Sequence, residues 1–114
     1  MKKSILDVLW VEREESLLGF HIRGHAGDWA QGENIVCAAV SAIAQCTAMG
    51  IIDVAGVRPA LYMEEGDMQL LLPDNMTAEQ AKDASTLLRS MEIGLRSIAA
   101  DNQDIIAIRR ENTV

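Results

Sequence analysis

The stretch GHAGDWAQGENIVCAAVS, residues 24–41, joins a predicted strand to an apolar helix and decides the arrangement of the N-terminal half of the chain. The strand ends at Gly24, and a loop that carries His25 follows it. Asn34 is a good N-cap residue, so we expect the helix to begin there, with Cys37 in its first turn. A loop histidine and a cysteine at a helix start make a candidate site for thiol chemistry.

This candidate site has a physical rationale in both of its residues. The unpaired N–H groups and the positive dipole end of a helix favour the thiolate form of Cys37, which is the nucleophilic form. The glycines Gly24, Gly27 and Gly32 give the loop the flexibility to bring the His25 ring within hydrogen-bond reach of the sulfur. On spacing alone, however, a buried helix cysteine beside an unrelated histidine is the more frequent arrangement.

Three motifs of the same stretch resemble a known family, the ribosomal-processing cysteine proteases or Prp family. The motifs are the run GHAG that starts at Gly24, the glycine at position 32, and the run IVCAAVSA that starts at Ile35. The likeness continues through Arg58-Pro59 to the final helix and strand, so it covers nearly the whole chain. This pattern is specific, and it favours catalysis over a structural role for the cysteine.

The resemblance implies an activity and a substrate. By resemblance, His25 and Cys37 are the catalytic pair, and the family's mobile loop corresponds to Gly27–Glu33. The implied substrate is a short N-terminal extension on a large-subunit ribosomal protein, which is removed so that the mature protein can take its place in the ribosome. The resemblance also implies an α+β fold and a homodimer, and no cofactor is predicted.

Two further positions are candidates for supporting the site. Family members usually carry aspartate before the Ile-Val-Cys run, where this chain has Asn34. A carboxylate stabilises an imidazolium by charge whereas an amide only orients it, but capping explains the asparagine equally well. Ser41 lies one helical turn beyond Cys37, where its hydroxyl either supports the site or simply packs.

Length, composition and charge narrow the class of protein. The 114 residues suit one domain, 1–114, and 49 % of them are apolar, which is enough for a core. The net charge of −7 argues against direct binding to a nucleic-acid backbone and suits a basic protein or peptide as partner. The N-terminal residues do not follow the pattern of a secretory signal, so we expect a cytoplasmic protein.

The two cysteines and the two histidines are placed so that neither pair forms a structural site. Cys37 and Cys46 are nine residues apart, about half a turn around a helix, so we expect no disulfide and a small core residue at Cys46. His21 should face outward from its strand. If that strand continued, His21 and His25 would be about 13 Å apart, too far to share a metal ion, and no metal site is predicted.

The remaining chain predicts five strands and two helices. The apolar segment Ile35–Ile52 just reaches the length of a membrane span, but its polar residues and alanines favour a helix that is buried or covered by a second copy. Thr77 and Gln80 form a capping box for the second helix. Apolar residues then repeat at alternating three- and four-residue steps, which predicts a stripe that faces the core: Ala81, Ala84, Leu88, Met91, Leu95 and Ile98. The expected strands are 4–11, 16–23, 60–63, 68–72 and 105–109. The order ββαββαβ predicts an α+β domain with a mainly antiparallel sheet.

The turn of the second predicted hairpin carries three carboxylates, Glu64, Glu65 and Asp67. Such a turn attracts basic peptides, but it is more often simply solvated, and no site is predicted there.

Two rival functions stay open. The first rival is a binding module that has lost turnover through Asn34. The second is a thiol-redox protein, but such a protein usually needs a second cysteine near the first, and this chain has none near Cys37.

Overall fold

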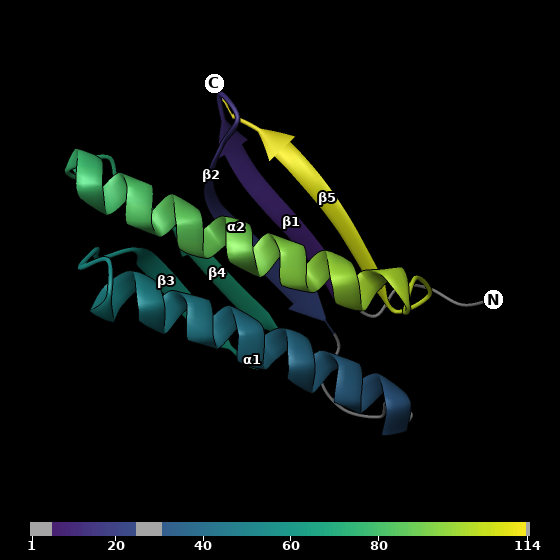
Figure 1. Cartoon of the computed structure of the whole chain (residues 1–114). Coiled ribbons are helices and arrows are strands. Elements are labelled where there is room, and N and C mark those ends of the chain that lie inside the picture. Colours follow the sequence, from purple (N-terminus) through teal and green to yellow (C-terminus); the bar gives the residue numbers. More distant parts are fainter. Residues whose placement is uncertain (1–5, 25–30, 114) are drawn as a thin grey trace.

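The structure, a computed structural model, describes residues 6–24 and 31–113, and for residues 31–34 it describes the backbone alone. Five strands and two helices follow one another in the predicted order ββαββαβ (Figure 1). They are β1 (Leu6–Arg13), β2 (Ser16–Gly24), α1 (Gln31–Asp53), β3 (Ala60–Glu64), β4 (Asp67–Leu71), α2 (Ala78–Ala100) and β5 (Ile106–Asn112).

All five strands form one sheet in the order β3-β4-β2-β1-β5. The pairs β1–β2, β2–β4 and β3–β4 are antiparallel, whereas β1 and β5 are parallel. The parallel pair arises because α2 carries the chain from β4 back across the sheet to its far edge (Figure 1). The prediction of a mainly antiparallel α+β fold is confirmed.

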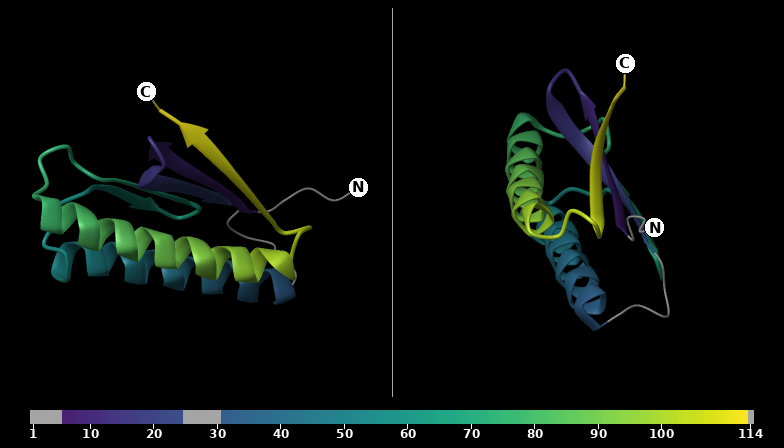
Figure 2. Two further views of the ribbon diagram at one scale, coloured as in Figure 1. Left: turned by 45° about the horizontal axis from the view of Figure 1, so that its top comes forward. Right: turned by 90° about the vertical axis from the view of Figure 1, so that its right-hand side faces the viewer.

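Both helices lie against the same face of this sheet (Figure 2). The strands alternate accordingly, and Leu6, Val8 and Trp10 of β1 are buried while the residues between them are partly exposed. Trp10 packs edge-on against Phe20 of β2, with ring centroids 5.9 Å apart. The core therefore lies between the helices and one face of the sheet, and we call the other face the open face.

Helix α2 follows its sequence pattern closely. Thr77 is its N-cap, and Thr77 and Gln80 exchange side-chain-to-backbone hydrogen bonds of 3.0 Å in each direction. The apolar stripe faces the core and buries four residues, Ala84, Leu88, Met91 and Leu95. The predicted capping box and core stripe are confirmed.

Helix α1 buries only one of its sides. Val40, Ala44 and Ile51 are almost fully buried, whereas other apolar residues of the helix are exposed. The segment Ile35–Asp53 is long and apolar enough to cross a membrane, a property that core helices of soluble proteins share, and 39 % of it is buried within the molecule. An apolar outer side therefore faces away from the core. We call it the outer face of α1, and its exposed residues are Ile35, Ala38, Ala42, Cys46, Met49 and Ile52.

Candidate active site

Cys37 lies on the inner side of α1 and is 8 % exposed. Helix α1 begins at Gln31, so Cys37 is its seventh residue and lies in the second turn, not in the first as predicted. The helix starts earlier because Gln31 and Glu33 are good helix formers, and an acidic residue suits a helix start. Because the effect of the helix dipole is largest in the first turn, it acts on Cys37 less strongly than a helix start at Asn34 would imply.

Asn34 is the fourth residue of α1 and therefore not its N-cap. Capping was the simple explanation for asparagine at this position, and the observed helix start removes it. The earlier start also moves the N–H groups that lack a partner within the helix to its first turn, ahead of Cys37. A supporting role for Asn34 stays a prediction.

The glycines assigned to the flexible loop have different positions in the fold. Gly24 is the last residue of β2, and its N–H donates to the Gly66 carbonyl at 3.0 Å. Gly32 is the second residue of α1, so its placement in a loop was wrong. Gly27 and the predicted base His25 lie outside the described residues. The chain of six residues from 25 to 30 connects Gly24 to α1.

Ser41 is exposed on α1, although it is one turn from the buried Cys37. Its Oγ accepts a hydrogen bond of 2.8 Å from Nε2 of Gln45, further along the helix. The observed bond therefore links Ser41 to its own helix. A role beside Cys37 stays a prediction.

His21, the other histidine, lies on the open face of the sheet, as predicted. Its neighbours in register are Leu9 of β1 and Gln69 of β4, and its Nε2 is 2.8 Å from Oδ1 of Asp67. Cys37 belongs to the core on the opposite face. The backbone of the sheet therefore separates His21 from the thiol.

Cys46 is exposed, so its prediction as a core residue was wrong. A separation of nine positions places Cys46 about 180° around the helix from Cys37, and a helix that buries only its Cys37 side must therefore expose Cys46. Cys37 and Cys46 thus lie on opposite sides of α1, one buried and the other exposed.

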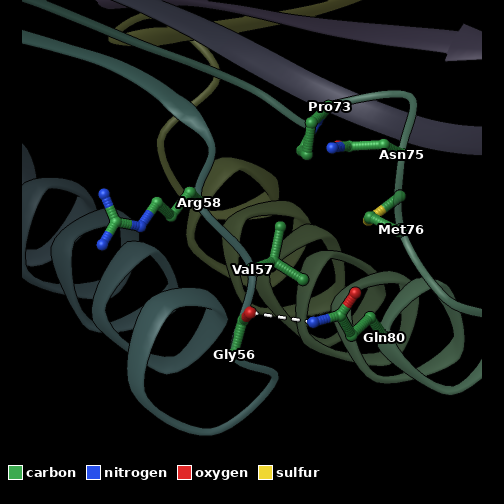
Figure 3. Close-up of a pocket in the computed structure, with 7 residues that line it drawn as sticks. All are labelled: Gly56, Val57, Arg58, Pro73, Asn75, Met76 and Gln80. Carbon is green, nitrogen blue, oxygen red and sulfur yellow. Dashed lines mark hydrogen bonds between the residues drawn. The ribbon is translucent and has the colours of Figure 1, made fainter.

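Residues of the segment that follows α1, together with residues at and before the start of α2, line a pocket of about 220 Å³ (Figure 3). Its lining comes from three segments: Gly56, Val57, Arg58, Pro73, Asn75, Met76 and Gln80. Nε2 of Gln80 donates to the Gly56 carbonyl at 2.9 Å, which ties the start of α2 to the end of α1. The sixteen residues from Cys37 to Asp53 span about 24 Å of helix, so this pocket is remote from the thiol.

In the part of the chain that the structure describes, no group of three His, Cys, Asp or Glu side chains could hold a metal ion. The reactive group that the described residues of α1 offer on the inner side of the helix is the thiol of Cys37. Cys37 is part of the hydrophobic core cluster.

Comparison with known proteins settles the family. The sequence model of the family described as "Cysteine protease Prp" matches residues 6–107. The chain belongs to the cysteine protease Prp family. It is therefore an enzyme of the cysteine protease class, and the resemblance seen in the sequence is confirmed.

Relatives of known sequence and structure agree with membership of the Prp family. The ribosomal processing cysteine protease Prp of Bacillus subtilis (strain 168) is 28 % identical over 97 residues, which cover 83 % of this chain and 87 % of the relative. SMU.848 from Streptococcus mutans superposes with a TM-score of 0.84 at 21 % identity, covering 96 % of this chain and 97 % of the other. The essential ribosomal processing protease Prp from S. aureus, in complex with a substrate peptide, gives 0.83 at 21 % identity, covering 94 % and 100 %. These structures show that the chain has the Prp fold.

Proposed function

We propose that this chain is an endopeptidase that removes the N-terminal extension of a large-subunit ribosomal protein, with Cys37 as nucleophile and His25 as its base. The observation that carries the proposal is the family match over residues 6–107, which includes both positions. Two relatives support the substrate class. The Bacillus subtilis protein is named for ribosomal processing, and the S. aureus protein was solved with a substrate peptide.

The proposed reaction proceeds through a thioester. His25 accepts the thiol proton, and the Cys37 sulfur attacks the carbonyl carbon of the peptide bond. The C–N bond then breaks as His25 returns the proton to the leaving amine. In the second half, His25 takes a proton from water and the hydroxide attacks the thioester. The C–S bond then breaks as His25 returns the proton to the sulfur, which releases the carboxylic acid product and regenerates the thiol. Developing negative charge on the carbonyl oxygen needs N–H donors, and the first turn of α1 offers groups without helical partners.

Cleavage of a peptide that spans the host ribosomal protein's N-terminal extension tests this function directly. We expect the native chain to cut the peptide and Cys37→Ala to lose activity by a factor of at least about 10³. Cys46→Ala is the matched control, because Cys46 is on the same helix but exposed on its outer face. Equal rates in the native chain and in Cys37→Ala would refute the proposal.

A binding module is the second candidate, and Asn34 favours it because the family usually has aspartate there. Asn34 lies within α1, one turn ahead of Cys37, and is not a cap. If Asn34→Asp turns an inactive protein into an active one, the native chain is a weakened or binding-only member. Undiminished cutting by the native chain excludes this candidate.

We also propose that two copies associate through the outer face of α1. Ile35 is 65 % exposed, Met49 61 % and Ile52 41 %, so apolar side chains follow this face from the turn before Cys37 to the end of the helix. Ala38 and Ala42 lie between them and permit close approach of a second helix. A concentration-dependent doubling of mass in sedimentation is the expected result.

A cytoplasmic location completes the proposal. An exposed thiol at Cys46 with no disulfide fits a reducing compartment. Cell fractionation should place the protein with soluble cytoplasmic markers, and recovery in the membrane fraction would contradict this location.

A further inference from the structure

We propose that the free edge of β3 binds the substrate as an added, extended strand and leads it to Cys37. The inference rests on the proposed peptidase function and deepens it, because it assigns the surface that receives the peptide on its way to the thiol. The occupant is an extended, cationic segment of the substrate.

Strand β3 is the outermost strand of the sheet, and within residues 6–24 and 31–113 it pairs only with β4. All five of its residues are exposed. An edge strand leaves alternate N–H and C=O groups unpaired, and proteins usually protect such edges with lysine, proline or a bulge. Residues Ala60–Glu64 contain neither lysine nor proline, and their register with β4 is regular. This edge is therefore open to pairing with another strand.

The side chains of β3 suit an extended peptide. Leu61 and Met63 lie on the helix-facing side, opposite the buried Leu70 and Met68 of β4, yet they are 39 % and 47 % exposed. Tyr62 extends to the open face and is 49 % exposed. Apolar contacts are thus available on both sides of an added strand, matching the alternation of its own side chains.

The edge of β3 leads toward the turn of α1 that carries Cys37. The Val57 N–H donates to the Ile51 carbonyl at 3.0 Å, so the chain turns back beside α1 at this level. From Ile51 to Cys37 the helix axis spans about 21 Å, and the segment Val57–Glu64 covers at most about 23 Å when extended. In Figure 1, β3 passes obliquely behind α1, from the C-terminal end of the helix toward its N-terminal half. A strand added to β3 that continues past Glu64 therefore approaches the turn of α1 that carries Cys37.

The far end of β3 is also tied to the strand that precedes His25. Gly66, in the turn after β3, accepts the hydrogen bond from the N–H of Gly24. Asp67 and Arg23 face each other in the register of β4 and β2. The β3–β4 hairpin is thus held against the end of β2, and a peptide that follows its edge arrives beside the start of the connection to α1.

Charge selects a cationic peptide. Glu64 and Glu65 are exposed at the end of β3, where the added strand leaves the sheet. The chain as a whole carries a net charge of −7. Lysine or arginine near the scissile bond would therefore meet negative charge just before the thiol.

A scan of the substrate peptide with single N-methyl groups tests the inference. Each methyl removes one backbone donor, so we expect KM to rise by about tenfold at every second position and to stay nearly unchanged between them. A binding mode that depends on side chains alone predicts no such alternation. Cleavage of the unmodified peptide without any period-two pattern overturns the inference and leaves the peptidase function intact.

Edge variants test the same surface from the protein side. Leu61→Lys and Met63→Lys should raise KM for the peptide by about tenfold while changing kcat little, because they place repelling charges beside the edge. Ile93→Lys is the matched control, since Ile93 is an exposed apolar residue on α2, away from the edge of β3. If the edge variants alter the mass of the protein in solution instead of KM, the edge serves a second copy and the proposal is wrong.

Hydrogen exchange separates failure of binding from failure of catalysis. With Cys37→Ala and the peptide, the amides of Leu61–Glu64 that point outward should gain protection. Protection without cleavage by the native chain supports the edge and refutes the peptidase function. Peptide binding without protection of β3 refutes the edge alone.

Discussion

His21 of β2 and Asp67 of β4 pair on the open face of the sheet, with 2.8 Å between Nε2 and Oδ1. Cys37 is in the core on the opposite face. We therefore expect His21→Gln to keep kcat/KM close to the native value, whereas His25→Gln should lower kcat by about 10²–10⁴-fold through loss of the general base. Initial rates of peptide cleavage measure both. Loss of turnover in a folded His21→Gln protein would reverse the assignment of the base.

Most of the fold could be predicted because its signals are local. The capping box at Thr77 and the stripe from Ala84 to Leu95 need only sequence spacing, and both are found. The parallel pairing of β1 with β5 was not specified, because it depends on where α2 returns the chain and no local pattern encodes that. The order of elements nevertheless sufficed for the fold class.

The candidate site was predicted less completely than the fold. The motif around Cys37 identified the family, but the helix start was placed at Asn34 because capping rules are local, while the helix continues N-terminally to Gln31. Cys46 was taken as a core residue because the apolar helix was expected to be buried nearly all round. Which side of α1 is covered depends on tertiary packing, and composition does not reveal it.

Gly19 of β2 lies so close to the backbone of the neighbouring strand β4 that a side chain has no room there. A Cβ at this position would lie 2.0 Å from the carbonyl oxygen of Leu70 on the neighbouring strand. We expect Gly19→Ala to lower the free energy of unfolding by about 2 kcal/mol or more, because backbone atoms must move apart. Urea denaturation, followed by circular dichroism, measures the change.

Gly94 of α2 is the matched control for this substitution. A Cβ there would lie 3.7 Å from Cδ1 of Ile43, an ordinary contact, within a helix that favours alanine. Gly94→Ala should therefore raise the free energy of unfolding by roughly 0.5–1 kcal/mol. If both alanine variants shift stability in the same direction, the close approach at Gly19 is not the cause.

The β1–β2 turn holds two glutamates in a backbone conformation that L-residues disfavour. Glu14 has φ 51° and Glu15 has φ 70°. Asn-Gly suits such a turn, so the double variant Glu14→Asn, Glu15→Gly should raise the free energy of unfolding by about 1 kcal/mol. Thermal and urea unfolding measure the gain.

The β3–β4 turn tests the same effect of positive φ in the opposite direction, because a glycine is replaced there. Gly66 already occupies a positive φ of 79° there. Gly66→Ala should lower the free energy of unfolding by about 1 kcal/mol, because alanine tolerates this conformation poorly. A destabilised Asn-Gly variant at positions 14 and 15 would show that the glutamates make contacts worth more than the strain.

Association through the outer face of α1 gives the last prediction. Met49 is 61 % exposed near the C-terminal end of this face, and Ile93 of α2 is 69 % exposed on a different surface. Placing an ammonium group in an apolar interface leaves it unpaired, so Met49→Lys should weaken the dimer by at least about tenfold in Kd, whereas Ile93→Lys should not. Sedimentation over a range of concentrations measures both constants. A native chain that stays monomeric at all concentrations, or equal weakening by the two variants, would show that this face does not join two copies.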